Sequence, residues 1–141
     1  MEELLVYAFL MEEGFPIENR YEEKLNELFM RSPDNEDLLE LEFLSGKRKE
    51  TAIYIRTHMD VNGLDIYKFG KEFMGVLKPV YESMEIHEFG SWMYRVWENL
   101  PDSLQKEDPF FALCYADDPL SWGDEKQARE IYEKMLSYYE E

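Results

Sequence analysis

Residues 51–55 of this 141-residue chain read TAIYI, and their conformation decides the fold class. The run is rich in β-branched residues, which favour a strand. A lone strand has no hydrogen-bonding partner, however, and no other segment has a convincing strand pattern. A helix over residues 47–60 is the alternative, and we predict it, although the five residues by themselves allow both conformations. The helical stripe would consist of Ala52, Ile55, Arg56 and Met59.

Helical spacing of apolar residues continues on both sides of this run. Such segments span residues 2–13, 17–30, 33–44, 64–84, 86–99, 109–115 and 124–139. The last is the clearest, with a stripe of Ala128, Ile131, Tyr132, Met135, Leu136 and Tyr139. Short helices joined by short loops pack as antiparallel neighbours, so we predict an all-α fold, a compact bundle of about seven to eight short helices stacked as antiparallel hairpins. Turn residues recur at irregular intervals, which disfavours a helical repeat.

Several residues predict how these helices begin, end or bend. Ser32 and Pro33 are typical of an N-cap followed by the first helical residue. Gly46 suits a left-handed residue that ends the same helix. Pro79 is expected to kink or divide the segment 64–84, because proline cannot donate the backbone hydrogen bond of a helix interior.

The length of the chain fits one domain, residues 1–141, without a linker. Cys114 is the only cysteine, which excludes an internal disulfide and favours a reducing cytoplasm. It follows the apolar residues 110–113, so we expect a buried, unreactive thiol. The sequence has no signal-peptide pattern and no apolar run of about 18 residues, so we predict no membrane span.

Charge is the most informative property of the sequence. The formal net charge is −17. Residues 1–46 carry 13 acidic and 3 basic residues (−10), residues 47–97 carry 7 and 8 (+1), and residues 98–141 carry 12 and 4 (−8). This balance argues against direct binding of nucleic acid or an anionic membrane, because both require a cationic surface. Acidity can serve solubility alone, but small domains need a charge of only about 2–8 for that purpose. We therefore expect a basic protein partner.

Two acidic runs are the candidate partner-binding surfaces. The predicted contact residues are Asp34, Glu36, Asp37 and Glu40 in the first run, and Asp117, Asp118, Trp122 and Asp124 in the second. An aromatic ring among carboxylates suits a partner rich in Lys and Arg. Trp122 has a simpler interpretation, which we prefer: it pins the loop 117–123 onto the core.

The sequence contains no recognisable catalytic or metal-binding pattern. His58 and His87 are the only histidines, and their spacing matches no zinc motif, so a surface or helix-end position is expected for each. No phosphate-binding glycine loop or nucleophile elbow is present. The sequence therefore predicts no metal, no cofactor and no enzymatic activity.

In size, helical pattern and acidic runs, notably Glu36–Glu40 (EDLLE) and Asp117–Asp124 (DDPLSWGD), the chain resembles the small acidic cytoplasmic immunity proteins of bacterial toxin systems. The resemblance implies an inhibitor that neutralises a cationic toxin domain, often a nuclease, through an acidic face. It carries over no individual site residue. Two other functions fit the same composition: a DNA-mimic or anti-restriction protein, and a helical adaptor whose acidity serves only solubility.

Overall fold

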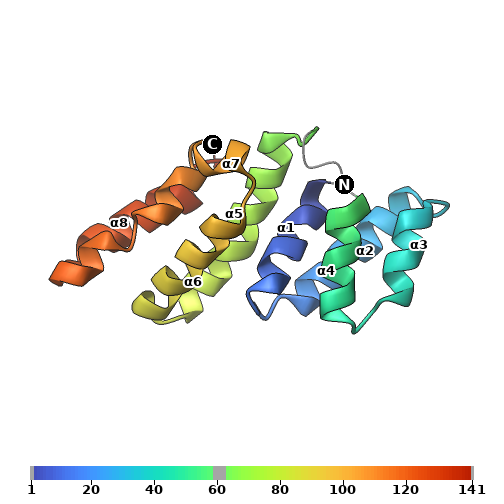
Figure 1. Cartoon of the computed structure of the whole chain (residues 1–141), viewed down its shortest axis with the longest axis horizontal. Helices are drawn as coiled ribbons and strands as arrows, with labels where there is room; N and C mark the ends of the chain where they lie inside the picture. Colours follow the sequence, from blue (N-terminus) through green and yellow to red (C-terminus); the bar gives the residue numbers. More distant parts are fainter. Residues whose placement is uncertain (1, 59–62, 141) are drawn as a thin grey trace. The chain divides into compact units, whose positions relative to one another are not determined.

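The computed structural model describes residues 2–58 and 63–140 and confirms the all-α prediction. Within these ranges the chain forms α-helices and two 3₁₀ helices, without a strand (Figure 1). The elements are α1 (Glu2–Glu12), α2 (Glu18–Arg31), α3 (Glu36–Phe43), α4 (Arg48–His58), α5 (Ile66–Ser83), α6 (Ile86–Asn99), α7 (Asp102–Gln105), η1 (Phe110–Cys114), η2 (Asp118–Trp122) and α8 (Glu125–Leu136).

The contacts of the chain fall into two compact units, Met1–Phe69 and Gly70–Glu141, and the boundary lies within α5. The first holds 16 acidic and 8 basic residues (−8), and the second holds 16 and 7 (−9). The excess negative charge is therefore divided almost equally between them, although it is uneven along the sequence.

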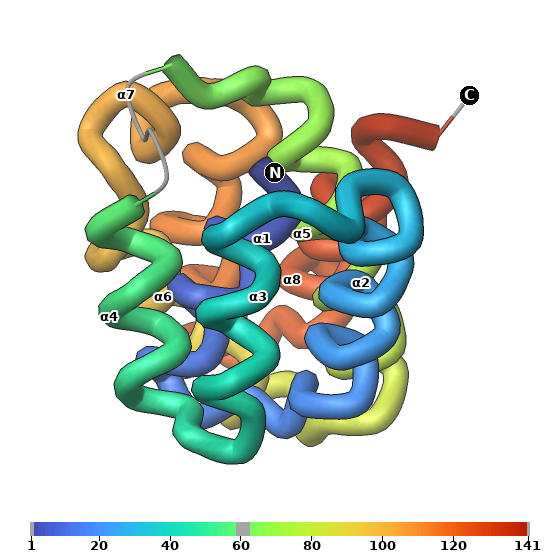
Figure 2. The backbone as a smooth tube through the Cα atoms, turned by 90° about the vertical axis from the view of Figure 1, so that its right-hand side faces the viewer, coloured from blue at the N-terminus to red at the C-terminus, as the bar shows by residue number. Residues whose placement is uncertain are grey.

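In the first unit, α1 is the most deeply buried helix. All its residues from Leu4 to Met11 are buried. Helix α4 packs along α1, α2 also contacts α1, and α3 contacts both α2 and α4 (Figure 2). Arg56 on α4 links two of these helices, because its guanidinium pairs with Glu12 at 2.7 Å and lies 5.0 Å from the ring centre of Phe9.

The run that decides the fold class is helical. Thr51, Ala52 and Ile55 are buried, whereas Ile53 is 54% exposed. This burial follows the helical period rather than the alternation of a strand, because residues three and four positions apart share the side that packs on α1. The prediction of a helix here is confirmed up to His58, and its last residues, including Met59, lie outside the described ranges.

The predicted start of α3 is wrong by three residues. Ser32 follows the last residue of α2, and its backbone N–H donates to the carbonyl of Leu28. The N-cap of α3 is Asn35, whose side-chain oxygen accepts hydrogen bonds from the backbone N–H groups of Asp37 (2.9 Å) and Leu38 (3.2 Å). Asn35 satisfies two otherwise unpaired amides at the helix start, so the helix begins after it and Pro33 belongs to the turn.

In the second unit, aromatic side chains join helices that are distant in the sequence. The ring of Phe89 on α6 lies 5.0 Å from that of Tyr132 on α8 and 5.2 Å from that of Tyr81 on α5. Of the two effects expected of Pro79, a kink or a division, the division does not occur, because α5 continues to Ser83. The segment 117–123, expected as a loop, contains the 3₁₀ helix η2.

Among the described residues, every helix falls short of the length and apolar character required to cross a membrane.

Candidate functional site

The first predicted acidic run lies around the N-terminus of α3. Asp34, Glu36 and Glu40 are exposed, and Asp37 is half-buried. The hydroxyl of Tyr54 on α4 donates a 2.8 Å hydrogen bond to Oδ1 of Asp37. Asp37 therefore connects α3 with α4, and it is less available to a partner than its three neighbours.

The charges of this run also act on the phenol of Tyr54. The hydrogen bond to Asp37 is the main cause that raises the pKa of Tyr54 to about 12, and the charges of Glu40 and Glu36 add to it. Three of the four predicted residues thus act on one phenol, and Asp37 contacts it directly. The ring of Tyr54 also stacks on His58, with ring centres 3.9 Å apart. His58 is exposed near the end of α4, as predicted.

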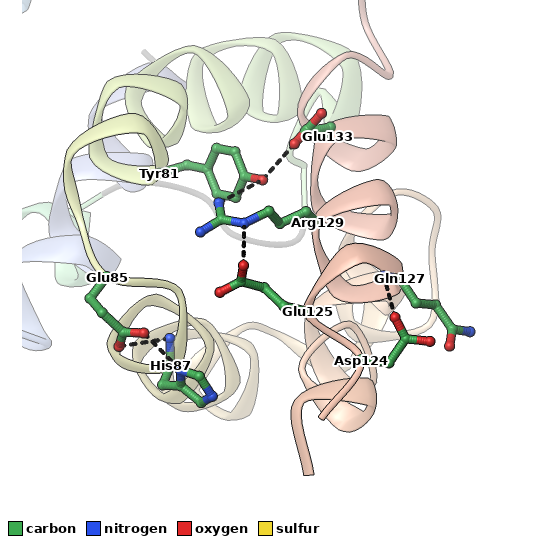
Figure 3. Close-up of polar contacts among 8 residues, drawn as sticks. All are labelled: Tyr81, Glu85, His87, Asp124, Glu125, Gln127, Arg129 and Glu133. Atoms are coloured by element: carbon green, nitrogen blue, oxygen red, sulfur yellow. Dashed lines mark hydrogen bonds and ion pairs between the residues drawn. The ribbon is translucent and has the colours of Figure 1, made fainter. Parts of the chain in front are cut away.

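The four predicted residues of the second run lie in and beside η2, and we call them the η2 surface: Asp117, Asp118, Trp122 and Asp124. Gly123, with a φ of 81°, ends η2 in a left-handed conformation and turns the chain into α8. Asp124 is the N-cap of α8, and its Oδ1 accepts a 3.0 Å hydrogen bond from the backbone N–H of Gln127 (Figure 3). Its carboxylate therefore also has a structural role.

Asp117 and Asp118 differ in their surroundings. Asp118 is exposed, whereas Asp117 is half-buried and burial raises the pKa of its carboxyl group. Asp117 packs against α6 at Gly90, where an added Cβ would lie 2.8 Å from the Cβ of Asp117. Asp118 is thus the more available anion of the two.

The preferred interpretation of Trp122 is wrong. Its side chain is 63% exposed, so it does not pin the segment onto the core. The burial of this segment comes instead from Pro119, and Ser121 closes the turn by donating to the backbone carbonyl of Asp118 at 2.7 Å. This large exposed ring is therefore available to a partner.

A third polar cluster, which sequence reasoning missed, joins α5 to α8 (Figure 3). The hydroxyl of Tyr81 donates to Oε2 of Glu133 at 2.7 Å. Arg129 lies beside the same hydroxyl at 3.5 Å and pairs with Glu125, also at 3.5 Å. Glu125, Arg129 and Glu133 are spaced four residues apart, which predicts one helical face, but nothing in the sequence indicated that Tyr81 would face them.

The remaining reactive side chains are those of His87 and Cys114. Glu85 is the N-cap of α6, and its carboxylate accepts from the backbone N–H of His87 and contacts the ring Nδ1 of this exposed residue at 2.7 Å. Cys114 is half-buried rather than buried, and burial is the main cause that raises the pKa of its thiol. Within residues 2–58 and 63–140, no group of three or more His, Cys, Asp or Glu side chains is placed to hold a metal ion.

No protein-family model, curated protein or solved structure matches this chain.

Proposed function

We propose that the protein is a non-catalytic inhibitor that binds a basic protein partner in the bacterial cytoplasm. The observation that carries the proposal is the exposure of both Trp122 and Asp118 on η2. Exposed aromatic rings are frequent anchors of protein interfaces, and their faces attract Arg and Lys side chains. A net charge of −17 adds a long-range attraction for a cationic surface.

An immunity protein of a toxin system is the specific form that we propose. A nuclease toxin needs a cationic groove to bind phosphates, and an acidic protein can occupy that groove or block access to it. Both units carry a similar negative charge, so both can contribute to steering the partner. Electrostatic steering raises the association rate and makes it dependent on salt.

The test uses the product of the gene adjacent to the one that encodes this protein. We expect this product to arrest bacterial growth when expressed alone, and co-expression of the protein to restore growth. With both proteins purified, association should slow as salt is raised, because screening weakens the attraction. A neighbour whose expression is harmless, or that does not bind, would contradict the proposal.

Variants of the η2 surface then locate the contact. Asp118→Lys should slow association about tenfold, whereas Trp122→Ala should mainly accelerate dissociation, because an anchor acts after the encounter. Glu98→Lys is the matched control, since it makes the same change of charge at an exposed position on α6. Equal effects of Asp118→Lys and Glu98→Lys would remove the η2 surface from the contact.

A further inference from the structure

An open hollow between α2 and α3 has walls that are largely apolar. Its volume is about 570 Å³, and it is lined by Asn26, Phe29, Met30, Pro33 and Glu42. The two helices lie side by side (Figure 2) and are joined by the short turn 32–35. Met30 is 86% exposed, which is unusual for a large apolar side chain. An exposed apolar wall of this kind is typical of an interaction site.

The helices that form the hollow are strongly acidic. Residues 18–43 carry nine acidic and three basic residues, a net charge of −6. Two of the three basic side chains, Lys24 and Arg31, pair with Glu27 on the same helix. The charges of Glu42 and Glu22 both act on the buried phenol of Tyr21, whose pKa is raised to about 12 mainly by burial. Of these two carboxylates, Glu42 lies in the wall of the hollow.

This combination of shape and charge restricts what can occupy the hollow. Residues 2–58 contain no strand, so an extended segment has no sheet edge to pair with there. A second copy of this chain is disfavoured, because each copy carries a net charge of −17. A helix with one apolar and one basic face fits, since its apolar side chains can contact Met30 while its basic side chains meet the carboxylates.

We propose that the hollow between α2 and α3 binds a basic amphipathic helix of the partner. The inference rests on the proposed function, because it takes the partner to be a basic protein. It adds a second contact in the first unit, distinct from the η2 surface in the second. Met30 supplies the apolar contact and Glu42 supplies the anionic one.

A synthetic peptide tests the proposal on the full chain. The probe is a helix of about 18 residues, or five turns, with leucines on one face and lysines and arginines on the other. A scrambled peptide of the same composition, without an apolar face, is the control. The protein is labelled at the methyl groups of its eight methionines, and Met30→Gln assigns the signal of Met30. We expect the amphipathic peptide to shift this signal at low salt and the scrambled peptide to leave it unchanged.

Variants separate a specific site from general attraction of charge. Met30→Gln and Glu42→Lys should each weaken binding of the peptide about tenfold. The matched controls are Ile53→Ser and Glu50→Lys on α4, an exposed apolar residue and an exposed carboxylate of the same unit, and they should change binding less than twofold. Because Met30 and Glu42 are exposed, circular dichroism should show that both variants fold.

Failure of this inference is distinguishable from failure of the proposed function. Equal binding of both peptides, or an unchanged Met30 signal, would overturn the inference. The inference would also be overturned if Met30→Gln weakened binding of the peptide but left binding of the intact partner unchanged. The proposed contact at the η2 surface would then remain. A chain that binds no basic partner at all would instead refute the proposed function.

Discussion

The hydroxyl of Tyr54 donates a 2.8 Å hydrogen bond to the carboxylate of Asp37, and this bond connects α4 with the first turn of α3. One carboxylate of the first acidic run is therefore held in place by a neutral side chain. The neighbouring Glu36 and Glu40 add negative potential at the phenol and oppose its ionisation. The acidic N-terminus of α3, which the sequence predicts as a contact surface, is thus also part of the packing of the first unit.

This bond predicts a loss of stability at alkaline pH. The pKa of Tyr54 is raised to about 12, against about 10 in the unfolded chain. Its contribution to the free energy of unfolding is therefore present below pH 10 and is lost as pH rises toward 12. Tyr54→Phe should destabilise the protein by about 1 kcal/mol at pH 7, and the difference from wild type should disappear between pH 10 and 12. Urea titrations at several pH values measure this.

Tyr115→Phe is the control for that experiment, because Tyr115 is 40% exposed and lies in the second unit. Its stability difference from wild type should stay small from pH 7 to 12. A difference for Tyr54→Phe that persists unchanged at pH 12 would show that the ionisation of Tyr54 is not linked to folding.

Gly90 should be intolerant of even the smallest side chain. Alanine is favoured over glycine in a helix by about 1 kcal/mol. At this position, however, the new methyl group would lie 2.8 Å from the Cβ of Asp117. We expect Gly90→Ala to lower the free energy of unfolding by about 1–3 kcal/mol, as overpacking does. Ser91→Ala, at the next and exposed position of α6, should change it by less than about 0.5 kcal/mol, and thermal unfolding of both variants checks the contrast.

The N-cap of α6 predicts a loss of stability in acid. Hydrogen bonds from the side chain and backbone of His87 are the main causes that lower the pKa of Glu85 from its usual value near 4.5 to about 2. The ionised cap therefore stabilises the fold above pH 4.5 and loses this effect as pH falls to 2.

Thermal unfolding of Glu85→Ala between pH 7 and pH 2 measures that contribution. The variant should be less stable than wild type at pH 7, and the two should converge near pH 2. Glu88→Ala, in the first turn of the same helix, leaves the cap in place and is the comparison. If Glu85→Ala remained equally destabilised at pH 2, the lowered pKa would be incorrect.

Substitution of Trp97 should cost more stability than substitution of Trp122. Trp122 is 63% exposed, so Trp122→Ala should change the free energy of unfolding by less than about 0.5 kcal/mol. The indole N–H of Trp97 donates to the backbone carbonyl of Gln105 at 3.1 Å, so Trp97→Phe should be destabilising. Acrylamide should quench the fluorescence of wild type more strongly than that of Trp122→Phe. Equal quenching would place Trp122 away from solvent.

Local sequence patterns were sufficient to predict most helices, but not the residues at which they begin and end. The segment 86–99 was predicted with the bounds that α6 has, because its apolar stripe lies between clear breaks. The start of α3 was missed because Ser32, Pro33 and Asn35 are all acceptable near a helix start. Only the hydrogen bonds of the folded chain distinguish them. Pro79 was expected to kink or divide the segment 64–84, and the structure excludes the division, since α5 continues beyond it.

The candidate sites, like the helices, could be predicted from the sequence only in part. The acidic runs were visible as sequence, and so was the presence of Trp122 among carboxylates. The exposure of Trp122 could not be predicted, because an aromatic residue near apolar neighbours is as consistent with burial in the core as with binding to a partner. Likewise, nothing in the sequence indicated that Asp37 would accept a hydrogen bond from a residue 17 positions away, or that Met30 would line a hollow with Glu42.

The sequence by itself determined that this protein is an acidic, helical chain, because periodicity and charge are properties of neighbouring residues and survive any arrangement of the helices. The tertiary structure alone decided which carboxylates support the fold and which face solvent. Whether a side chain is buried or hydrogen-bonded depends on what another part of the chain brings to it, and that contact is not encoded in local spacing.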